Sequence, residues 1–242
     1  MMDKLTGVYA VRPAQGPHKL RDSIPLQCIL RDKLNIALNG TEIKNILHQR
    51  EGLIKVDHKV RRNSKFPCGL MDVVEIPKMN KQFRVLYDVK KRFTLVKLKQ
   101  KEAEFKLCKV QKKFIGPNKT CYHVTHDGRT LKFINPDIEM NDTVKLNLVD
   151  NKVVDFIKLE VGNTVFCQQG NNRGRVGICV HITKFDGQHD LITVKDARGN
   201  SFTTRTSYVM AIGHGSKSEI TLPKDQGIKK TIVEEREENK NN

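Results

Sequence analysis

The apolar positions near the start of the chain recur at the spacing of a helix. Beginning at Ile24, they form one stripe made of Leu26, Ile29, Leu30, Leu34, Ala37 and Leu38. Charged residues such as Arg31 and Lys33 fall outside this stripe. The pattern predicts a helix that ends at Gly40.

A second helix is predicted directly after the first. Thr41 is a suitable residue to cap its start, and Gly52 is suited to end it and release the chain into a strand over residues 53–56. The helix would bury Ile43, Ile46 and Leu47 and carry Lys44, His48 and Arg50 at its edge. The predicted order is therefore helix, helix, strand.

The pattern then changes to the alternation and short apolar runs of β structure. Four pairs of runs flank turn residues and predict hairpins: 83–87 with 93–98, 121–125 with 130–133, 144–148 with 153–157, and 191–194 with 202–204. Helix is predicted only at residues 100–107 and after Lys230. The fold class is α+β, predominantly β.

A weak recurrence divides the β part of the chain. Residues 70–74, 140–144 and 161–165 each place Asp or Asn just ahead of an apolar run. Short polar side chains at such positions close a turn on their own backbone and open a strand. The recurrence predicts three compact β-rich units.

The charge of the chain indicates what kind of partner it binds. The 242 residues contain 44 Lys and Arg against 27 Asp and Glu, a net charge of +17, without a block of six like charges. Such a balance is typical of a protein that binds a polyanion with a folded surface. Aromatic residues are only 6% and Trp is absent, which favours recognition of a nucleic-acid backbone over stacking of bases on an aromatic sheet.

Two segments offer the most suitable donors for phosphate. The loop over residues 168–175 has glycines that permit left-handed backbone, and Asn172, Arg173 and Arg175 lie at its tip. The first 23 residues contain Pro and Gly at spacings that keep them extended, and they predict a basic strap that carries Arg12, His18, Lys19 and Arg21.

The cysteines and histidines could in principle form a zinc site or a nucleophilic catalytic site. Their spacing argues against both. Cys121, His123 and His126, with Cys108 as a fourth ligand, would place His126 on the opposite strand face or in the turn, so we expect no zinc site. Cys167 or Cys179 with His181 lacks an orienting third group, so we expect no nucleophilic catalysis. The loop glycines are not followed by the Lys-Ser or Lys-Thr of a nucleotide-binding loop.

The cysteines are widely separated in sequence and are read as buried thiols. The N-terminus does not resemble a signal peptide, and no apolar run approaches the length of a membrane span. We therefore expect a reducing, cytosolic or nuclear compartment and no membrane partner.

The chain also resembles a known family in segments that follow one another in the right order over nearly its whole length. They are residues 2–10, 16–21, 29–34, 67–73, 87–88, 106–110, 124–127, 194–196 and 232–236. They are similar to the eukaryotic and archaeal type of small-subunit ribosomal protein four. The resemblance implies a structural constituent of the small (40S) ribosomal subunit without catalysis or cofactor, whose partners are small-subunit rRNA and neighbouring ribosomal proteins. It also implies cytoplasmic ribosomes, assembly in the nucleus or nucleolus, and no small-molecule substrate.

The resemblance implies boundaries and contacts as well. It divides the chain into an extended basic segment over 1–23, an RNA-binding module of the ribosomal protein S4 type over 24–76, a central β domain over 77–159, a small KOW or SH3-like barrel over 160–196, and a C-terminal extension over 197–242. Carried over by position, the RNA-facing residues of the module are Arg31, Lys33, Lys44, Arg50, Lys55, Lys59 and Arg61, and those of the barrel are Asn172, Arg173 and Arg175.

Four departures from the family pattern bear on local contacts. The family has a longer basic arm ahead of Asp3, and Glu51 with Gly52 resembles a small insertion. His58 and Gln169 stand where the family has glycines, so a left-handed turn at His58 is expected to be strained or remodelled.

Two other functions stay open at this point. An RNA-modifying enzyme such as a pseudouridine synthase also carries helix-helix-strand modules, but it needs an activated Asp, and only Asp127 is available near Gly and Arg. A transcription factor with a KOW unit would associate with polymerase.

Overall fold

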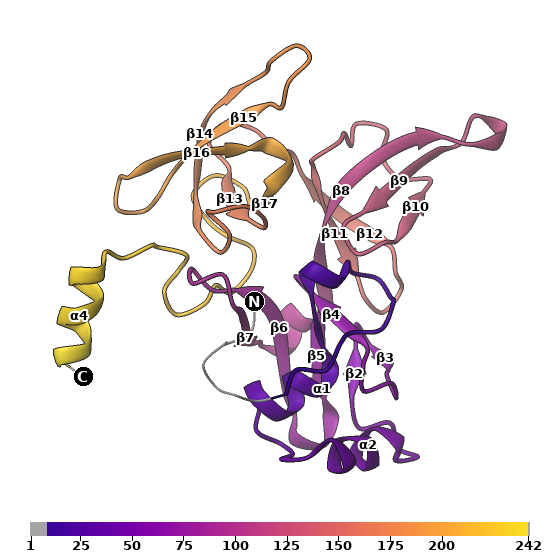
Figure 1. Cartoon of the computed structure of the whole chain (residues 1–242). Coiled ribbons are helices and arrows are strands. Elements are labelled where there is room, and N and C mark those ends of the chain that lie inside the picture. The colour runs from indigo at the N-terminus through magenta and orange to yellow at the C-terminus, as the bar shows by residue number, and fades with distance from the viewer. Residues whose placement is uncertain (1–8, 242) are drawn as a thin grey trace.

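The computed structural model describes residues 9–241 and consists mainly of three five-stranded antiparallel sheets with few helices (Figure 1). This architecture confirms the predicted fold class, α+β and predominantly β. No helix within the described range is both long and apolar enough to cross a bilayer.

The first sheet has the strand order β3-β2-β5-β6-β7. Its strands are β2 (Lys55–Val56), β3 (Lys59–Val60), β5 (Val73–Ile76), β6 (Lys81–Tyr87) and β7 (Phe93–Lys97). A separate two-stranded pair joins β1 (Ser23–Pro25) to β4 (Pro67–Gly69). The helices α1 (Leu26–Cys28) and α2 (Gly40–His48) lie beside the first sheet at the bottom of Figure 1. Their apolar stripes supply buried residues to the same core as this sheet.

The first helix is shorter than predicted. After α1 the chain makes one π turn (Ile29–Lys33), and Asn35 then adopts a left-handed backbone with φ of 50°, which ends the helix. Consequently Ala37 is buried outside any helix and Leu38 is 79% exposed.

The second helix begins differently from the prediction. Asn39 caps it in a capping box with Glu42, so Thr41 is already inside the helix and Gly40 begins it instead of ending the previous one. The predicted strand over 53–56 is reduced to the paired residues Lys55 and Val56.

The second sheet has the order β10-β9-β8-β11-β12, and the third has the order β16-β15-β14-β13-β17. The bounds of the second are β8 (Phe105–Ile115), β9 (Cys121–Thr125), β10 (Thr130–Lys132), β11 (Thr143–Asn147) and β12 (Val153–Ile157). Those of the third are β13 (Thr164–Cys167), β14 (Val176–Thr183), β15 (Leu191–Lys195), β16 (Ser201–Arg205) and β17 (Val209–Gly213). All four predicted hairpins are therefore present.

The remaining elements are short, apart from the C-terminal helix. They are α3 (Gln100–Ala103), α4 (Ile232–Asn241) and the 3-10 turns Leu20–Asp22, Pro77–Met79, Pro117–Lys119 and Thr206–Tyr208. The helix predicted over 100–107 is wrong in its second half, because the chain enters β8 at Phe105. The strands β16 and β17 lie beyond residue 196, where the barrel was expected to end, and they belong to the same sheet as β13 to β15.

The predicted recurrence marks a structural device that opens one strand in each sheet. Met71, Asn141 and Gly162 have φ of 68°, 75° and 94°, and each lies two residues before β5, β11 or β13. In the first two turns the following Asp accepts a hydrogen bond from the amide three residues earlier: Gly69 to Asp72 at 2.8 Å and Glu139 to Asp142 at 2.9 Å. The recurrence therefore reflects a shared turn, as predicted.

One apolar core connects the three sheets. Val74 and Leu86 of the first sheet, Leu107 of the second, and Phe166 and Met210 of the third belong to the same buried cluster. The sheets are therefore packed against one another through this shared core. The second and third sheets also have smaller clusters of their own.

The loop between β13 and β14 packs against the turn between β6 and β7 at Gly174. Its φ is 86°, and a Cβ there would lie 2.1 Å from the carbonyl oxygen of Asp88. Gly187 has a similar φ of 73° but open space around it. We predict that Gly174→Ala lowers the free energy of unfolding by about 1–3 kcal/mol more than Gly187→Ala, because only the former adds a clash to the backbone strain. Urea unfolding of the two variants measures the difference, and equal losses would show that the loop packs loosely there.

Candidate nucleic-acid interface

A buried lysine on β8 organises the contact between the first two sheets. Lys106 is 1% exposed, and its Nζ lies 2.9 Å from Asp57, 2.5 Å from Asp72 and 3.2 Å from Asp127. The three carboxylates come from the β2–β3 turn, the turn before β5 and the β9–β10 turn. An ammonium ion is stable in such a place only when several acceptors replace its water.

A second layer of contacts completes this cluster. Arg129 Nη2 lies 3.0 Å from Asp57, and its Nε lies 2.8 Å from Asp127. His18 of the N-terminal segment lies with Nε2 2.9 Å from Asp72. We call these six residues, Lys106, Asp57, Asp72, Asp127, Arg129 and His18, the buried ion cluster. It ties the N-terminal segment to the first and second sheets.

The left-handed turn expected at His58 is present and forms part of this arrangement. Asp57 and His58 have φ of 52° and 61°, the conformation of a two-residue hairpin turn that favours Gly at its second position. His58 Nδ1 lies 2.9 Å from Glu75, a contact that opposes the strain of a non-glycine residue there. Gln169, in contrast, does not adopt positive φ, so its replacement of a glycine introduces no such strain.

The electrostatics of the cluster favour the charged form of Lys106, Asp72 and Asp127. Burial opposes the charge of Lys106, but the three carboxylates raise its pKa well above the usual value. Burial likewise opposes the charge of Asp72 and Asp127, yet the neighbouring cations lower the pKa of both carboxyls. Lys106, Asp72 and Asp127 are therefore ions at neutral pH.

Two further buried cations connect other parts of the chain. Lys109, also on β8, donates to the carbonyls of Thr206, Ser207 and Val209 at 3.0, 2.9 and 2.5 Å, which joins the second sheet to the third. Its burial lowers its pKa to about 7. Arg84 on β6 donates to the carbonyls of Glu102 and Phe105 at 2.8 Å each, and its burial lowers its pKa to about 10.

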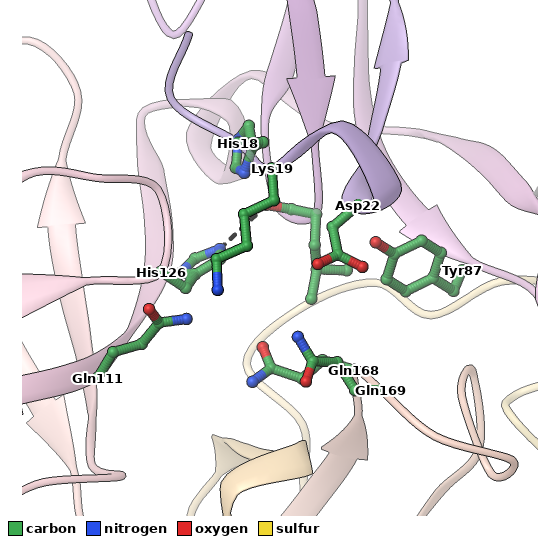
Figure 2. A pocket seen from close by; sticks show the side chains of 9 residues that line it. His18, Lys19, Asp22, Tyr87, Gln111, His126, Gln168 and Gln169 are labelled. Atoms are coloured by element: carbon green, nitrogen blue, oxygen red, sulfur yellow. Dashed lines mark hydrogen bonds between the residues drawn. The ribbon is translucent and has the colours of Figure 1, made fainter. Parts of the chain in front are cut away.

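A small cavity lies where the N-terminal segment meets the three sheets. Figure 2 shows Lys19, Asp22, Gln111, His126 and Gln168 around it, and its volume is about 40 Å³. This space suits a few water molecules rather than a nucleotide. His126 lies with Nε2 3.2 Å from the carbonyl oxygen of Leu70, the dashed line in Figure 2, and its burial lowers its pKa to about 4.

The predicted RNA-binding residues of the N-terminal third fall into three groups. Seven side chains are exposed: Arg12, Lys19, Arg21, Lys33, Lys44, Arg50 and Lys59. Three are partly buried: Arg31, Lys55 and Arg61. Of these, Arg31 is 2.5 Å from Asp32 and Arg61 lies over the ring of Phe66. His18 is buried and serves the ion cluster, so its role as an RNA ligand is not supported by the geometry.

The loop residues at 172–175 also differ from the expectation. Arg173 Nη2 lies 2.7 Å from Asp22, and its guanidinium covers the ring of Tyr87 at 4.6 Å. Arg175 pairs with buried Asp196 and covers Phe202 at 3.7 Å. Asn172 accepts a hydrogen bond from Arg175 at 3.2 Å. The loop folds onto the first sheet, so its arginines hold the fold together instead of facing outward.

The zinc ligands considered from the sequence do not come together as a set. Cys108 and His126 converge with Asp127, whereas Cys121 and His123 are not part of that group among the described residues. Asp127 is already paired with Lys106 and Arg129. These cations oppose the approach of a metal ion.

The cysteines considered as nucleophiles are buried. Burial raises the pKa of Cys167 to about 12 and raises that of Cys179. A protonated thiol is a poor nucleophile. His181 is exposed on the same strand as buried Cys179.

Comparison with known proteins identifies the family. The Ribosomal family S4e matches residues 79–153, and the family described as 40S ribosomal protein S4 C-terminus matches residues 196–242. Small ribosomal subunit protein eS4 of Tetrahymena thermophila is 52% identical over 236 residues, which cover 98% of this chain and 91% of the relative. The chain belongs to the S4e family of ribosomal proteins.

Other members of the S4e family support this assignment. Small ribosomal subunit protein eS4 of Bombyx mori is 48% identical over 98% of this chain and 89% of its own length. The crystal structure of the 30S ribosomal protein S4e from Thermoplasma acidophilum is similar with a TM-score of 0.69 at 32% identity, covering 82% of this chain and 99% of that one. The family resemblance read from the sequence is therefore confirmed.

Sequence reasoning missed the ion cluster that shapes this S4e chain. The sequence did contain a sign of buried cations, because Lys106 and Lys109 interrupt an otherwise apolar run over 105–110. A lysine within a buried strand requires acceptors. Their identity could not be read, since Asp57 and Asp72 lie 49 and 34 residues away.

We predict that Lys106→Met lowers the free energy of unfolding by about 3–5 kcal/mol at pH 7, because three carboxylates lose their main counter-charge. The loss of unfolding free energy caused by Lys106→Met should become smaller as the pH falls below about 4. A carboxyl with a lowered folded pKa adds stability above its usual pKa and loses it in acid, so the unmodified chain weakens there. Protonation meanwhile relieves the repulsion in the variant.

Urea unfolding at pH 7 and pH 3 measures both effects. Lys97→Met on β7 is the matched control, since Lys97 is exposed, and it should change stability by less than about 0.5 kcal/mol at either pH. An equal penalty for Lys106→Met at the two pH values would contradict the ionic account of the cluster.

Proposed function

We propose that this protein is a structural constituent of the small ribosomal subunit that binds small-subunit rRNA through its exposed cations, without catalysis. Membership in the S4e family carries this proposal, and its relatives bear the name small ribosomal subunit protein. The protein would act in cytoplasmic ribosomes after assembly in the nucleolus. Its other partners would be the ribosomal proteins around it.

The division of the cations into two classes supports the proposed role. Lys106, Lys109 and Arg84 are buried with internal acceptors. Others are exposed on a few neighbouring elements, namely Lys33 after α1, Lys44 and Arg50 on and after α2, and Lys59 on β3. These elements lie together at the bottom of Figure 1. A group of cations on rigid elements can neutralise several phosphates at once.

The proposed domain scheme follows from the same family. Residues 24–76 would act as the RNA-binding module of the S4 type, and the unit that starts near residue 160 would be the KOW or SH3-like barrel. The five-stranded sheet from β13 to β17 is compatible with such a barrel if the unit extends to Gly213. The tail after it would contact neighbours, since α4 exposes Ile232 and Val233.

An enzymatic role has less support. Asp127, the one candidate for an activated carboxylate, is 3% exposed and is paired with Lys106 and Arg129. A general base must be free to reach a substrate proton. The carboxylate instead holds the fold together.

We predict that replacing Lys33, Lys44 and Arg50 with Ala weakens binding to small-subunit rRNA and reduces the slope of log K against log salt by roughly 2–3, since each phosphate contact contributes about 0.7–0.9. The matched control replaces Lys78, Lys97 and Lys152, exposed lysines on other elements, and removes the same charge. Filter binding between 50 and 300 mM salt compares the two variants.

Sedimentation supplies the second measurement. The unmodified protein should sediment with small subunits, and the first variant should do so less completely than the control. Equal losses in both variants, affinity independent of salt, or association with polymerase instead of ribosomes would contradict the proposed function.

A further inference from the structure

The far half of the second sheet exposes one face built from three strands. β8, β9 and β10 pair so that Phe114, Tyr122 and Lys132 lie side by side across the strands, with Lys112, Val124 and Thr130 as the next row. Residues opposite each other in a ladder point to the same face. We call these six residues the hairpin face. The tip of this hairpin projects from the body in Figure 1.

Two aromatic rings are stacked on the hairpin face. The ring centroids of Phe114 and Tyr122 are 5.3 Å apart, and the planes differ by 12°. Phe114 is 47% exposed although it is a large apolar residue. A Cβ on Gly116 would lie 2.3 Å from Cε2 of Tyr122, so the Tyr122 ring rests against the backbone and its position is fixed. The pair is a pre-formed aromatic stack that can serve as a platform for a base.

The opposite face of the same strands is covered at its inner end, although Ile115 near the tip is 76% exposed. Lys113 donates to the carbonyls of Pro136 and Ile138 at 3.1 and 3.0 Å, and His123 lies 3.3 Å from the carbonyl of Ile138. The segment around Ile138 therefore covers that inner part. On the hairpin face, Lys112, Phe114 and Lys132 are exposed.

Charge complementarity indicates what covers the platform. Lys112 and Lys132 are exposed, and none of the six residues of the hairpin face is acidic. Stacked aromatic rings flanked by cations match the bases and phosphates of single-stranded RNA. A protein partner would have to bring both an apolar group and carboxylates to the same small area.

We propose that the hairpin face binds an unpaired RNA nucleotide, whose base stacks on Phe114 and Tyr122 while Lys112 and Lys132 contact the adjoining phosphates. This inference rests on the proposed function, which names rRNA as the partner, and it adds a base-stacking site to it. It differs from the expectation that the low aromatic content favours backbone recognition over base stacking. Few aromatic residues are needed when the strand register gathers two of them on one face.

The test uses single-stranded oligoadenylate of eight nucleotides and an RNA duplex of the same length. Phe114→Ala should weaken binding of the full chain to the single strand by about 5- to 100-fold, the range of one lost stacked base. It should leave the salt slope unchanged. Phe185→Ala is the matched control, because Phe185 is 43% exposed, much like Phe114, but lies between β14 and β15 of the third sheet, and it should bind like the unmodified chain. Binding to the duplex should not respond to either change.

Two further variants separate stacking from other contacts. Phe114→Leu keeps an apolar side chain without a ring and should lose affinity as Phe114→Ala does. Phe114→Trp introduces the one Trp of a chain that has none, and its fluorescence should be quenched by the single strand and not by the duplex. Full affinity in Phe114→Leu, or unquenched Trp, would overturn the stacking site.

The outcomes distinguish this inference from the function on which it rests. If Phe114→Ala binds the single strand normally while the variant at Lys33, Lys44 and Arg50 still loses rRNA binding, the hairpin face is not an RNA site and the proposed function stands. If neither change affects RNA, both proposals fail. Capture of a small-subunit protein by the hairpin face, lost in Phe114→Ala, would also overturn the RNA site.

Discussion

The need to compensate one buried ammonium group constrains how this chain folds. Lys106 is almost fully removed from water, so its charge must be balanced by groups the fold brings to it. The three carboxylates come from turns of two different sheets, and they meet only when both sheets and the N-terminal segment are in place. We interpret the buried ion cluster as a device that fixes orientation more than one that adds net stability. Lys109 and Arg84 apply the same principle at the third sheet and at α3.

This constraint also decides which charges are available to a partner. A net charge of +17 suggests a uniformly basic surface, but part of it is internal. Lys106 and Arg129 are neutralised by carboxylates, and Arg173 and Arg175 are paired with Asp22 and Asp196. The cations that can meet phosphate are the exposed ones, among them those on α2, on β3, along the N-terminal segment and on the hairpin face. Internal ion pairs hold the elements that carry the exposed cations in place, and a pre-organised surface has a lower entropic cost of binding.

Local patterns predicted much of the fold. The four hairpins followed from β-branched runs and turn residues, and the three strand-opening turns followed from Asp or Asn at matching positions. The helices were less accurate, because Asn35 ends the first one early and residues 105–107 pair with β11 despite a helical composition nearby. At residues 105–107 tertiary pairing outweighed local propensity, whereas Asn35 ended the first helix through its own left-handed backbone.

The site was harder to predict than the fold, since partners distant in sequence decide the role of each cation. Arg173 resembles a phosphate ligand until Asp22, 151 residues earlier, is found beside it. The hairpin face likewise depends on the register that aligns Phe114 with Tyr122, and composition alone pointed the other way. The exposed residues of α2 were predicted correctly as exposed, because helical spacing places them off the buried stripe.

Native-state hydrogen exchange tests most directly whether the buried cations unite the sheets. The account predicts that core amides of β5, β8 and β13 exchange with one common free energy, because no sheet can open without exposing Lys106 or Lys109 to a loss of partners. Separate and clearly different free energies for the three strands, with the first sheet opening while β8 and β13 stay protected, would contradict it.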